Sequence, residues 1–278
     1  MGRGLPNALL GDAEAAMPET VPSPAVAEAA APRPSLEDED HTSAAAGLAC
    51  NAGSADAPVP VRRVSLQGIG TRPVRVVCLS DTHSLQSSLP PDAVPPGDLL
   101  IHCGDFTKNG SEGEVEAFAS FLDSLPHPEK LVIAGNHDVG IFCEFRAQNA
   151  ERLLPGVRYL DNELVEVAGL KIYGSPWDRR GSRAIPPGVD ILVTHDPPSG
   201  VLDAGHGCEY LLQDVRDKKP RVHVFGHIHE ASGVATLPEP ADAAVPMPVT
   251  TFVNAAMANN GMIAKRLDKP ITVLELEP

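Results

Sequence analysis

The sequence predicts an α/β fold, with one sheet built from alternating strands and helices and a second sheet packed against it. From residue 71 onward, short β-branched runs alternate with segments of helical periodicity. Further strand-like runs follow later in the chain, and these indicate a second sheet packed against the first. The first 70 residues lack both patterns. The strongest predicted strands are Val74–Leu79, 98–103, 130–134, 190–194 and 221–225.

The N-terminal segment, residues 1–70, is predicted to be a disordered tail. It is rich in Ala, Pro and Ser, carries four basic and nine acidic residues, and contains no aromatic residue. Such a segment cannot bury enough apolar surface to offset the entropy of ordering the chain. We therefore place the folded domain at residues 71–278. A second Pro- and Ala-rich stretch, residues 237–248, is expected to be an exposed loop.

Helices and a hairpin are expected between the strands. Ser111 and Glu114 form a capping box, and apolar residues then recur at helical spacing through residue 125, which predicts a crossover helix between the second and third strands. Residues 208–216 are a second helix candidate. Two β-rich runs flank Ala168 and Gly169, at 163–167 and 171–173, and this pattern is typical of antiparallel strands around a tight turn.

Composition restricts the partners that this chain can have. The formal net charge is −15, which repels nucleic-acid polymers and anionic membranes. No apolar stretch approaches the roughly 18 residues of a membrane helix. The five cysteines are odd in number and scattered, so we expect neither a disulfide framework nor a thiolate zinc site. With no predicted signal peptide, these features favour a cytoplasmic protein.

Polar residues that can bind metals follow each of the five strands. The carboxyl ends of strands in open α/β sheets meet at one edge, where ligands bind. Within D-x-H and H-x-H, alternate residues of an extended chain point to the same side, so both members of each pair can face one site. The five groups are Asp81 with His83, Asp105, the run Asn136-His137-Asp138, His195, and His227 with His229.

These blocks resemble the calcineurin-like metallophosphoesterase family, whose motifs are D-x-H, G-D, G-N-H-[DE], a lone His and G-H-x-H. The resemblance spans about residues 73 to 277. The segments GDFTKNG, LVIAGNHDVG, GSPW, LVTHDPPSG and VHVFGHIHE are similar to the subfamily of metallophosphoesterase domain-containing proteins. The resemblance implies a sandwich of two mixed β-sheets flanked by helices, and hydrolysis of cyclic nucleotides or other phosphodiesters.

The resemblance also implies two divalent metal ions. One would be held by Asp81, His83, Asp105 and His229, and the other by Asp105, Asn136, His195 and His227. Carboxylate, amide and imidazole donors without thiolate suit Mn²⁺, Fe or Zn²⁺ and do not choose among them. Two such ions, about 3.5–4 Å apart, activate a bridging water and stabilise the charge on the phosphoryl group.

His137 and Asp138 are the predicted catalytic residues. A histidine next to a metal ligand can protonate the leaving oxygen near neutral pH. Asp138 either orients an imidazole or caps the following turn. Many family members carry an acidic residue where this chain has Lys108, so the partner that orients His137 is not evident. The interval between Trp177 and Asp190 is also shorter than in the subfamily.

Three residues near these motifs have a structural or a functional interpretation. His102 and His223 lie within apolar strands, and we interpret both as structural rather than as metal ligands. Arg183 lies in an arginine-rich loop, where it either contacts a phosphate or is solvated, and we favour solvation.

The predicted function is metal-dependent hydrolysis of a small phosphodiester, with cyclic nucleotides the best guess by resemblance. Phosphomonoester or phosphoprotein hydrolysis uses the same ligands and is the second hypothesis. A non-catalytic protein-binding scaffold on the same fold is the third. No substrate-binding residue is assigned from the sequence. We expect neither a nucleic-acid polymer nor a membrane as a partner.

Overall fold

The structure is a computed structural model that describes residues 59–66, 72–90, 92–140, 143–178, 183–236, 249–261 and 263–278. Every described residue belongs to one compact unit, Ala52–Pro278. Most of the predicted tail and the loop predicted at residues 237–248 lie outside the described residues. Among the described residues, no helix is long and apolar enough to cross a membrane.

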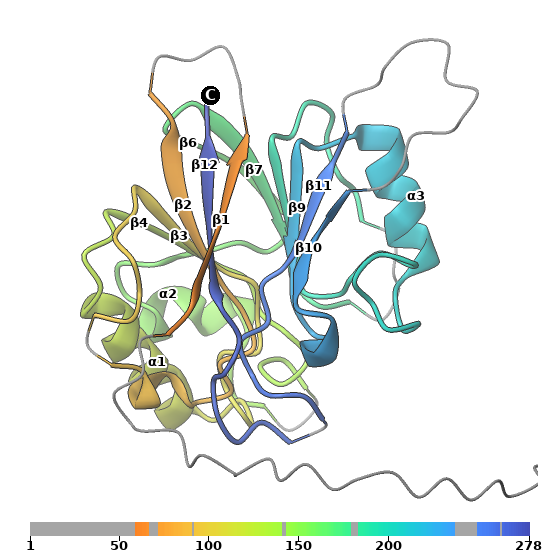
Figure 1. The fold of residues 1–278 in the computed structure, drawn as a ribbon. Helices are drawn as coiled ribbons and strands as arrows, with labels where there is room; N and C mark the ends of the chain where they lie inside the picture. The colour runs from red at the N-terminus through yellow and green to blue at the C-terminus, as the bar shows by residue number, and fades with distance from the viewer. Residues whose placement is uncertain are drawn as a thin grey trace, which may run out of the picture. The chain divides into compact units, whose positions relative to one another are not determined.

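The first sheet has six strands in the order β1-β12-β2-β3-β4-β5 (Figure 1). The strands β2, β3, β4 and β5 are parallel, β12 is antiparallel to β2, and β1 pairs in parallel with β12. The sheet is therefore mixed, as predicted. Its strands are β1 (Val61–Leu66), β2 (Val74–Leu79), β3 (Leu99–His102), β4 (Glu129–Val132), β5 (Arg158–Tyr159) and β12 (Ile271–Leu276).

The second sheet also has six strands, in the order β10-β11-β9-β8-β7-β6. Its four central strands are parallel, and β10 and β6 are antiparallel at the two edges. The predicted hairpin is confirmed, because Val167 pairs with Leu170 across the turn at Ala168 and Gly169. The strands are β6 (Glu163–Val167), β7 (Leu170–Ser175), β8 (Ile191–Thr194), β9 (Val222–Phe225), β10 (Gly233–Thr236) and β11 (Thr251–Asn254).

Helices cover the outer faces of both sheets. α1 (Glu112–Asp123) connects β3 with β4, and the predicted capping box is present, with Ser111 and Glu114 bonding to each other's amides. α2 (Ala150–Leu153) lies beside α1 over the first sheet, and α3 (Glu209–Lys218) covers the second. The other helical segments are the short 3₁₀ turns η1 (Gln86–Ser88), η2 (Ala147–Asn149) and η3 (His229–Ala231).

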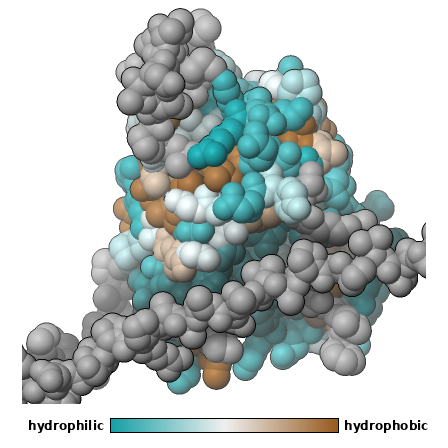
Figure 2. Space-filling view, turned by 90° about the vertical axis from the view of Figure 1, so that its right-hand side faces the viewer, coloured by the Kyte–Doolittle hydropathy of each residue, from teal (hydrophilic) through white to brown (hydrophobic). Residues whose placement is uncertain are grey.

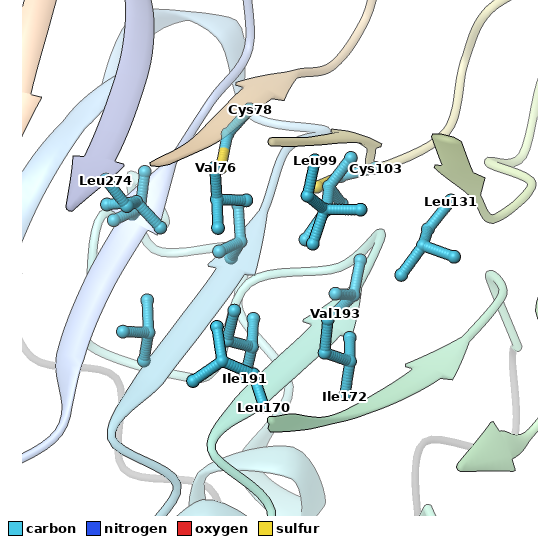
Figure 3. Packing of buried hydrophobic residues seen from close by; sticks show 14 of the residues in the cluster. Val76, Cys78, Leu99, Cys103, Leu131, Leu170, Ile172, Ile191, Val193 and Leu274 are labelled. Atoms are coloured by element: carbon cyan, nitrogen blue, oxygen red, sulfur yellow. The ribbon is translucent and has the colours of Figure 1, made fainter. Parts of the chain in front are cut away.

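The main core lies between the two sheets (Figure 3). Alternate residues of each strand point into it, as the period of two requires. Val76 and Cys78 of β2 face Ile191 and Val193 of β8, and all four are buried. Because the opposite faces pack against helices, the central strands are buried on both sides and read as continuous apolar runs. This is why the sequence identifies them easily.

One strand forms where a tail was predicted. β1 lies within residues 1–70, and its six residues pair with Ile271–Leu276 of β12. The predicted domain boundary at residue 71 is therefore too late for this strand. Its alternating, half-exposed pattern is that of an edge strand, and its partner lies some two hundred residues away, so local composition does not reveal it.

The face that carries α3 has a mixed surface. Hydrophilic residues surround a group of apolar ones there (Figure 2). Tyr210 of α3 is 67% exposed and Val234 of β10 is 37% exposed. A small group of exposed apolar residues is ordinary for a protein surface.

Candidate metal centre

The residues that follow the strands converge at one end of the two sheets. The loops after β2 and β3 run side by side, since the Asp81 amide donates to the Gly104 carbonyl (3.0 Å) and the His83 amide to the Asp105 carbonyl (2.9 Å). The second sheet joins them through the His227 amide, which donates to both Asp81 carboxylate oxygens at 3.0 and 3.1 Å. Backbone hydrogen bonds thus hold these residues in place independently of a metal.

Four of the predicted ligands have a left-handed backbone conformation. The φ angles are 55° at Asp81, 45° at His83, 53° at Asp105 and 69° at His227. A residue with a Cβ atom pays about 1 kcal/mol or more to adopt this conformation, and such residues cluster at functional sites. Their concentration at a single site indicates a function that requires this geometry.

One group of donors is formed by Asp81, His83 and His229. Asp81 Oδ1 lies 3.3 Å from His229 Nε2 and 3.9 Å from His83 Nε2, and the two Nε2 atoms are 3.1 Å apart. All three ligand atoms lie within 4.8 Å of one another. This spacing is close enough for one cation to contact all three.

A second group is formed by Asp105, His195 and His227, with Asn136 beside them. His195 Nε2 lies 3.4 Å from Asp105 Oδ2 and 3.1 Å from Asn136 Oδ1. Asp105 Oδ2 is also 3.8 Å from His83 Nε2 in the first group. A single carboxylate oxygen therefore faces both groups, and all seven predicted ligands lie at this end of the sheets.

The hydrogen bonds of the imidazoles show that a cation fits here. His195 Nδ1 donates to the Cys103 carbonyl (2.8 Å) and His229 Nδ1 to the Asn259 carbonyl (3.1 Å), because a carbonyl can only accept. In each neutral ring, Nε2 then carries a lone pair. These lone pairs point at carboxylate and amide oxygens, which are also acceptors. A divalent cation satisfies all of them at once.

The Asp105 carboxylate and the His195 imidazole strongly affect each other's ionisation. Burial disfavours the charged forms of both Asp105 and His195, but their mutual attraction outweighs it. As a result, the pKa of Asp105 is lowered and that of His195 is raised to about 10. The His83 and His227 pKa values are lowered, chiefly by burial. Without a metal ion, a proton on His195 thus balances the Asp105 charge, and a bound divalent cation would take the place of that proton and leave the ring neutral.

Glycines allow the strand ends to approach one another. A Cβ atom at Gly135 would collide with Asp105 Oδ1 and lie 2.7 Å from His195 Cε1. A Cβ atom at Gly226 would collide with Asp81 Oδ2 and with the Ser80 hydroxyl. Gly135 and Gly226 thus leave the space that the two carboxylates occupy.

His137 lines the cavity, and its orienting partner is a backbone group. Its Nδ1 donates to the carbonyl of Lys108 at 2.8 Å. The chain thus orients this ring without an acidic side chain at position 108. The ring packs edge-on against that of His83, with centroids 4.7 Å apart.

The Asp138 carboxylate caps a turn through backbone amides and bonds to none of the described imidazoles. Its Oδ2 accepts from the amides of Asp105 (2.7 Å) and Gly135 (2.8 Å), and its Oδ1 from the amide and hydroxyl of Thr107 (2.9 and 2.6 Å). Burial and the charge of Asp105 raise its pKa to about 7, against these hydrogen bonds. The placement of Asp138 among the catalytic residues is therefore corrected: it positions the loop that carries Asp105.

A cavity of about 420 Å³ opens onto both donor groups. Three of its wall residues, Ile228, Glu230 and Gly261, were not predicted from the sequence. Asn259, which supports one wall, was not predicted either. Asn259 organises a turn: its Oδ1 accepts from the amides of Lys265 (2.7 Å) and Arg266 (3.0 Å). Only the Asn-Asn-Gly turn signal at 259–261 marks this segment in the sequence. The lining residues are His83, Asp105, Asn136, His137, His227, Ile228, His229, Glu230 and Gly261.

Two histidines predicted to be structural lie outside both donor groups. His102 Nε2 contacts the Thr82 hydroxyl (3.1 Å) and His223 Nε2 the Thr194 hydroxyl (2.8 Å), and both rings are buried. Arg183 differs from its predicted solvated state. Its side chain is 1% exposed and forms an ion pair with Asp196 at 2.8 Å. The other loop arginines, Arg179 and Arg180, lie outside the described residues.

Comparison with known proteins gives a family. The model of the calcineurin-like phosphoesterase family matches residues 74–231. A UPF0046 protein of Caenorhabditis elegans is 38% identical over 227 residues, which cover 67% of this chain and 76% of that protein. The human metallophosphoesterase domain-containing protein 1 is 40% identical over 227 residues, covering 66% of each chain, so this chain spans just under two thirds of its length.

A solved structure from Thermus thermophilus superposes on this chain with a TM-score of 0.45 at 16% identity, covering 66% of this chain and 89% of that one. The family match and the clustered Asp and His donors together support a metal-dependent hydrolase that acts on phosphoester bonds. By the match of its residues 74–231, the chain belongs to the calcineurin-like phosphoesterase family.

Proposed function

We propose that this chain is a two-metal phosphodiesterase that hydrolyses small phosphodiesters. The observation that carries the proposal is Asp105, whose Oδ2 atom lies between His83 Nε2 (3.8 Å) and His195 Nε2 (3.4 Å). A carboxylate that faces two donor groups in this way suits a ligand shared by two cations. When bound, the cations would supply an activated water and stabilise charge on the phosphoryl group.

The ligands divide between the two sites by proximity. Asp105 is shared by both. The first site would be held by Asp81, His83, Asp105 and His229, and the second by Asp105, Asn136, His195 and His227. The backbone carbonyls of Cys103 and Asn259 hold one imidazole in each site with Nε2 toward the cation.

His137 is the proposed donor of a proton to the leaving oxygen. It lines the cavity, and the bond from its Nδ1 to the Lys108 carbonyl leaves Nε2 to carry the transferable proton. A positioned general acid of this kind accelerates the reaction by about 10²- to 10⁴-fold.

The cavity favours a diester over a monoester. Among its nine described lining residues there is neither Lys nor Arg, and Glu230 adds a carboxylate to the wall. A phosphomonoester carries about −1.5 to −2 charges at neutral pH, whereas a diester carries about −1. The diester therefore meets less repulsion from Glu230 and needs less cationic compensation.

The volume of the cavity and the net charge of the chain also favour a small substrate over a polymer. A cavity of about 420 Å³ lies in the range of small-molecule sites, which run from about 300 to 1,000 Å³. A net charge of −15 opposes a polyanionic polymer. We therefore propose small diesters, with cyclic nucleotides as the first natural candidates to assay.

The test compares hydrolysis of bis(p-nitrophenyl) phosphate with that of p-nitrophenyl phosphate, with Mn²⁺ and after chelation. We expect faster turnover of the diester, loss of turnover on chelation and recovery when Mn²⁺ is restored. Asp105→Asn removes the shared charge and is expected to lower kcat by about two to three orders of magnitude, equivalent to about 3–4 kcal/mol.

Asp123→Asn, at the exposed end of α1, is the matched control for loss of one carboxylate and should keep wild-type kcat. Faster turnover of the monoester would favour the phosphomonoesterase hypothesis. Hydrolysis that survives both chelation and Asp105→Asn would refute the two-metal mechanism. No turnover of either ester by metal-loaded protein would favour a scaffold.

A further inference from the structure

The loop between β3 and α1 sets the orientation of His137. Its Lys108 carbonyl accepts the hydrogen bond from His137 Nδ1 (2.8 Å). The position of a backbone carbonyl is fixed only when the loop that contains it is fixed. The orientation of the ring therefore depends on whatever holds residues 107–111.

Glu114 holds this loop with more contacts than a helix cap requires. A capping box needs the bond from the Glu114 side chain to the Ser111 amide, here 3.1 Å. In addition, Oε1 accepts from the Lys108 amide and Oε2 from the Asn109 amide, both at 3.2 Å. These two amides precede the helix, and one belongs to the residue whose carbonyl orients His137.

The same carboxylate also contacts the loop after β2. The Ser84 hydroxyl donates to Glu114 Oε1 at 3.0 Å and accepts from the Lys108 amide at 3.2 Å. Ser84 directly follows His83. Glu114 thus links the segment that carries His83 to the segment that orients His137.

The Glu114 carboxylate is held in its ionised form. Partial burial opposes ionisation, but hydrogen bonds from Ser111, Ser84 and Lys108 lower its pKa. Five donor groups converge on its two oxygens: the amides of Lys108, Asn109 and Ser111 and the hydroxyls of Ser84 and Ser111. An ionised carboxylate offers about four lone-pair sites, so these donors take up its whole accepting capacity.

We propose that Glu114 is a positioning residue for the reaction, which fixes the Lys108 carbonyl and through it the ring of His137. This inference rests on the proposed function, because it requires His137 to protonate the leaving oxygen. Glu114 is not among the described residues that line the cavity, so it acts on the reaction through the position of His137 and not by contact with the substrate.

Glu114→Gln isolates the positioning role from helix capping. Glutamine serves at this position of a capping box, so the cap is retained. A carboxamide, however, has one acceptor oxygen and an NH₂ group that is itself a donor. Several of the five donors then lose their acceptor, and the Lys108 carbonyl is no longer held against His137.

Two matched substrates report on proton donation. Diphenyl phosphate and p-nitrophenyl phenyl phosphate share a retained phenyl group and differ in the leaving group. Phenolate, whose conjugate acid has a pKa of about 10 as for tyrosine, leaves poorly without a proton. p-Nitrophenolate is a far weaker base and leaves without one. The ratio of the two kcat values thus measures proton donation, whereas a general structural defect lowers both values equally.

The experiment measures this ratio in metal-loaded wild-type protein and in variants. We expect His137→Ala to lower kcat for diphenyl phosphate about 100-fold relative to the p-nitrophenyl ester. Glu114→Gln should lower the same ratio about tenfold, and it should add nothing when combined with His137→Ala. Ser84→Ala, which removes one link without touching the cap, should lower the ratio less and serves if Glu114→Gln does not fold.

One control completes the test. Glu116→Gln makes the same chemical change on an exposed residue of α1 and should keep the wild-type ratio. If His137→Ala changes the ratio and neither Glu114→Gln nor Ser84→Ala does, the inference is overturned and the proposed function stands. If His137→Ala leaves the ratio unchanged, the acid role of His137 fails and this inference fails with it.

Discussion

Three of the histidines at the site are held by backbone carbonyls. His195, His229 and His137 donate from Nδ1 to the carbonyls of Cys103, Asn259 and Lys108, respectively. Each bond keeps a proton on Nδ1 and directs Nε2 into the site, where Nε2 of His195 and His229 can bind a cation and Nε2 of His137 can carry a second proton. A carbonyl is present at every residue, so the sequence identifies the imidazoles and says nothing about what orients them.

His223 gives a prediction at the residue scale that is independent of the metal centre. The Thr194 hydroxyl donates to the Asp196 carbonyl (2.7 Å), so it accepts from His223 Nε2 (2.8 Å), and the buried Nδ1 has no hydrogen-bond partner among the described residues. Burial, with a smaller contribution from Arg183, lowers the pKa of His223 to about 3, against about 6.5 in the unfolded chain.

Stability should therefore fall with acidification because of this ring. Below pH 6.5 the unfolded chain takes up a proton that the folded ring does not, so this contribution is present above pH 6.5 and is lost as the pH falls toward 3. The loss is about 1.4 kcal/mol per pH unit. His223→Gln should remove this slope when unfolding free energies are measured by denaturant between pH 7.5 and 4.5. An identical slope in both proteins would contradict a neutral buried ring.

At the scale of elements, the site is made by strand ends that approach closely. Gly226 follows β9 and lies beside the Asp81 carboxylate, and no space remains there for a Cβ atom. Gly226→Ala is expected to displace Asp81, to weaken binding of the metal and to destabilise the fold by about 1–3 kcal/mol. Metal content, hydrolysis of bis(p-nitrophenyl) phosphate and denaturant unfolding would measure all three effects.

Gly113→Ala is the matched control for Gly226→Ala. Gly113 lies in the exposed first turn of α1, with nothing within 4 Å of an added Cβ atom. Alanine is the better helix former by about 1 kcal/mol, so this variant should be as active as wild type and slightly more stable. Wild-type activity and metal content in Gly226→Ala would show that the close approach is unimportant.

Much of each sheet could be predicted from the sequence, because its central strands are buried on both faces and end in polar residues. Val74–Leu79 is predicted with its observed bounds, and the other four strands are within two residues at each end. The edge strand β1 could not be predicted, since its pairing with β12 is non-local and half of its residues are exposed.

The candidate site could also be predicted only in part from the sequence. The spacing of two within Asp81-Thr82-His83 and His227-Ile228-His229 identifies donors at strand ends. The role of Asp138 depended on the direction of one carboxylate toward the amides of Asp105 and Gly135, which spacing does not reveal. Asn259 supports the cavity wall through a turn far from every motif, and only the fold brings it there.

In the whole molecule, two mixed sheets bring residues between positions 83 and 261 to one cavity. The fold supplies the convergence, and the large negative charge leaves local cations as the simplest means of attracting a phosphate ester. Membership of the calcineurin-like phosphoesterase family is consistent with metal binding at this cavity. We propose that these side chains gather around a pair of divalent ions, and that this pair performs the hydrolysis.

The number of metal ions per chain decides between this proposal and its alternatives. Protein stripped by chelation, reloaded with Mn²⁺ and freed of excess ion would be analysed by inductively coupled plasma mass spectrometry while hydrolysis of bis(p-nitrophenyl) phosphate is followed. We expect two ions per chain and activity that rises as the second ion binds, and we expect Asp105→Asn to lose the second ion and most of the activity. Full activity with one ion per chain or fewer would refute the two-metal proposal.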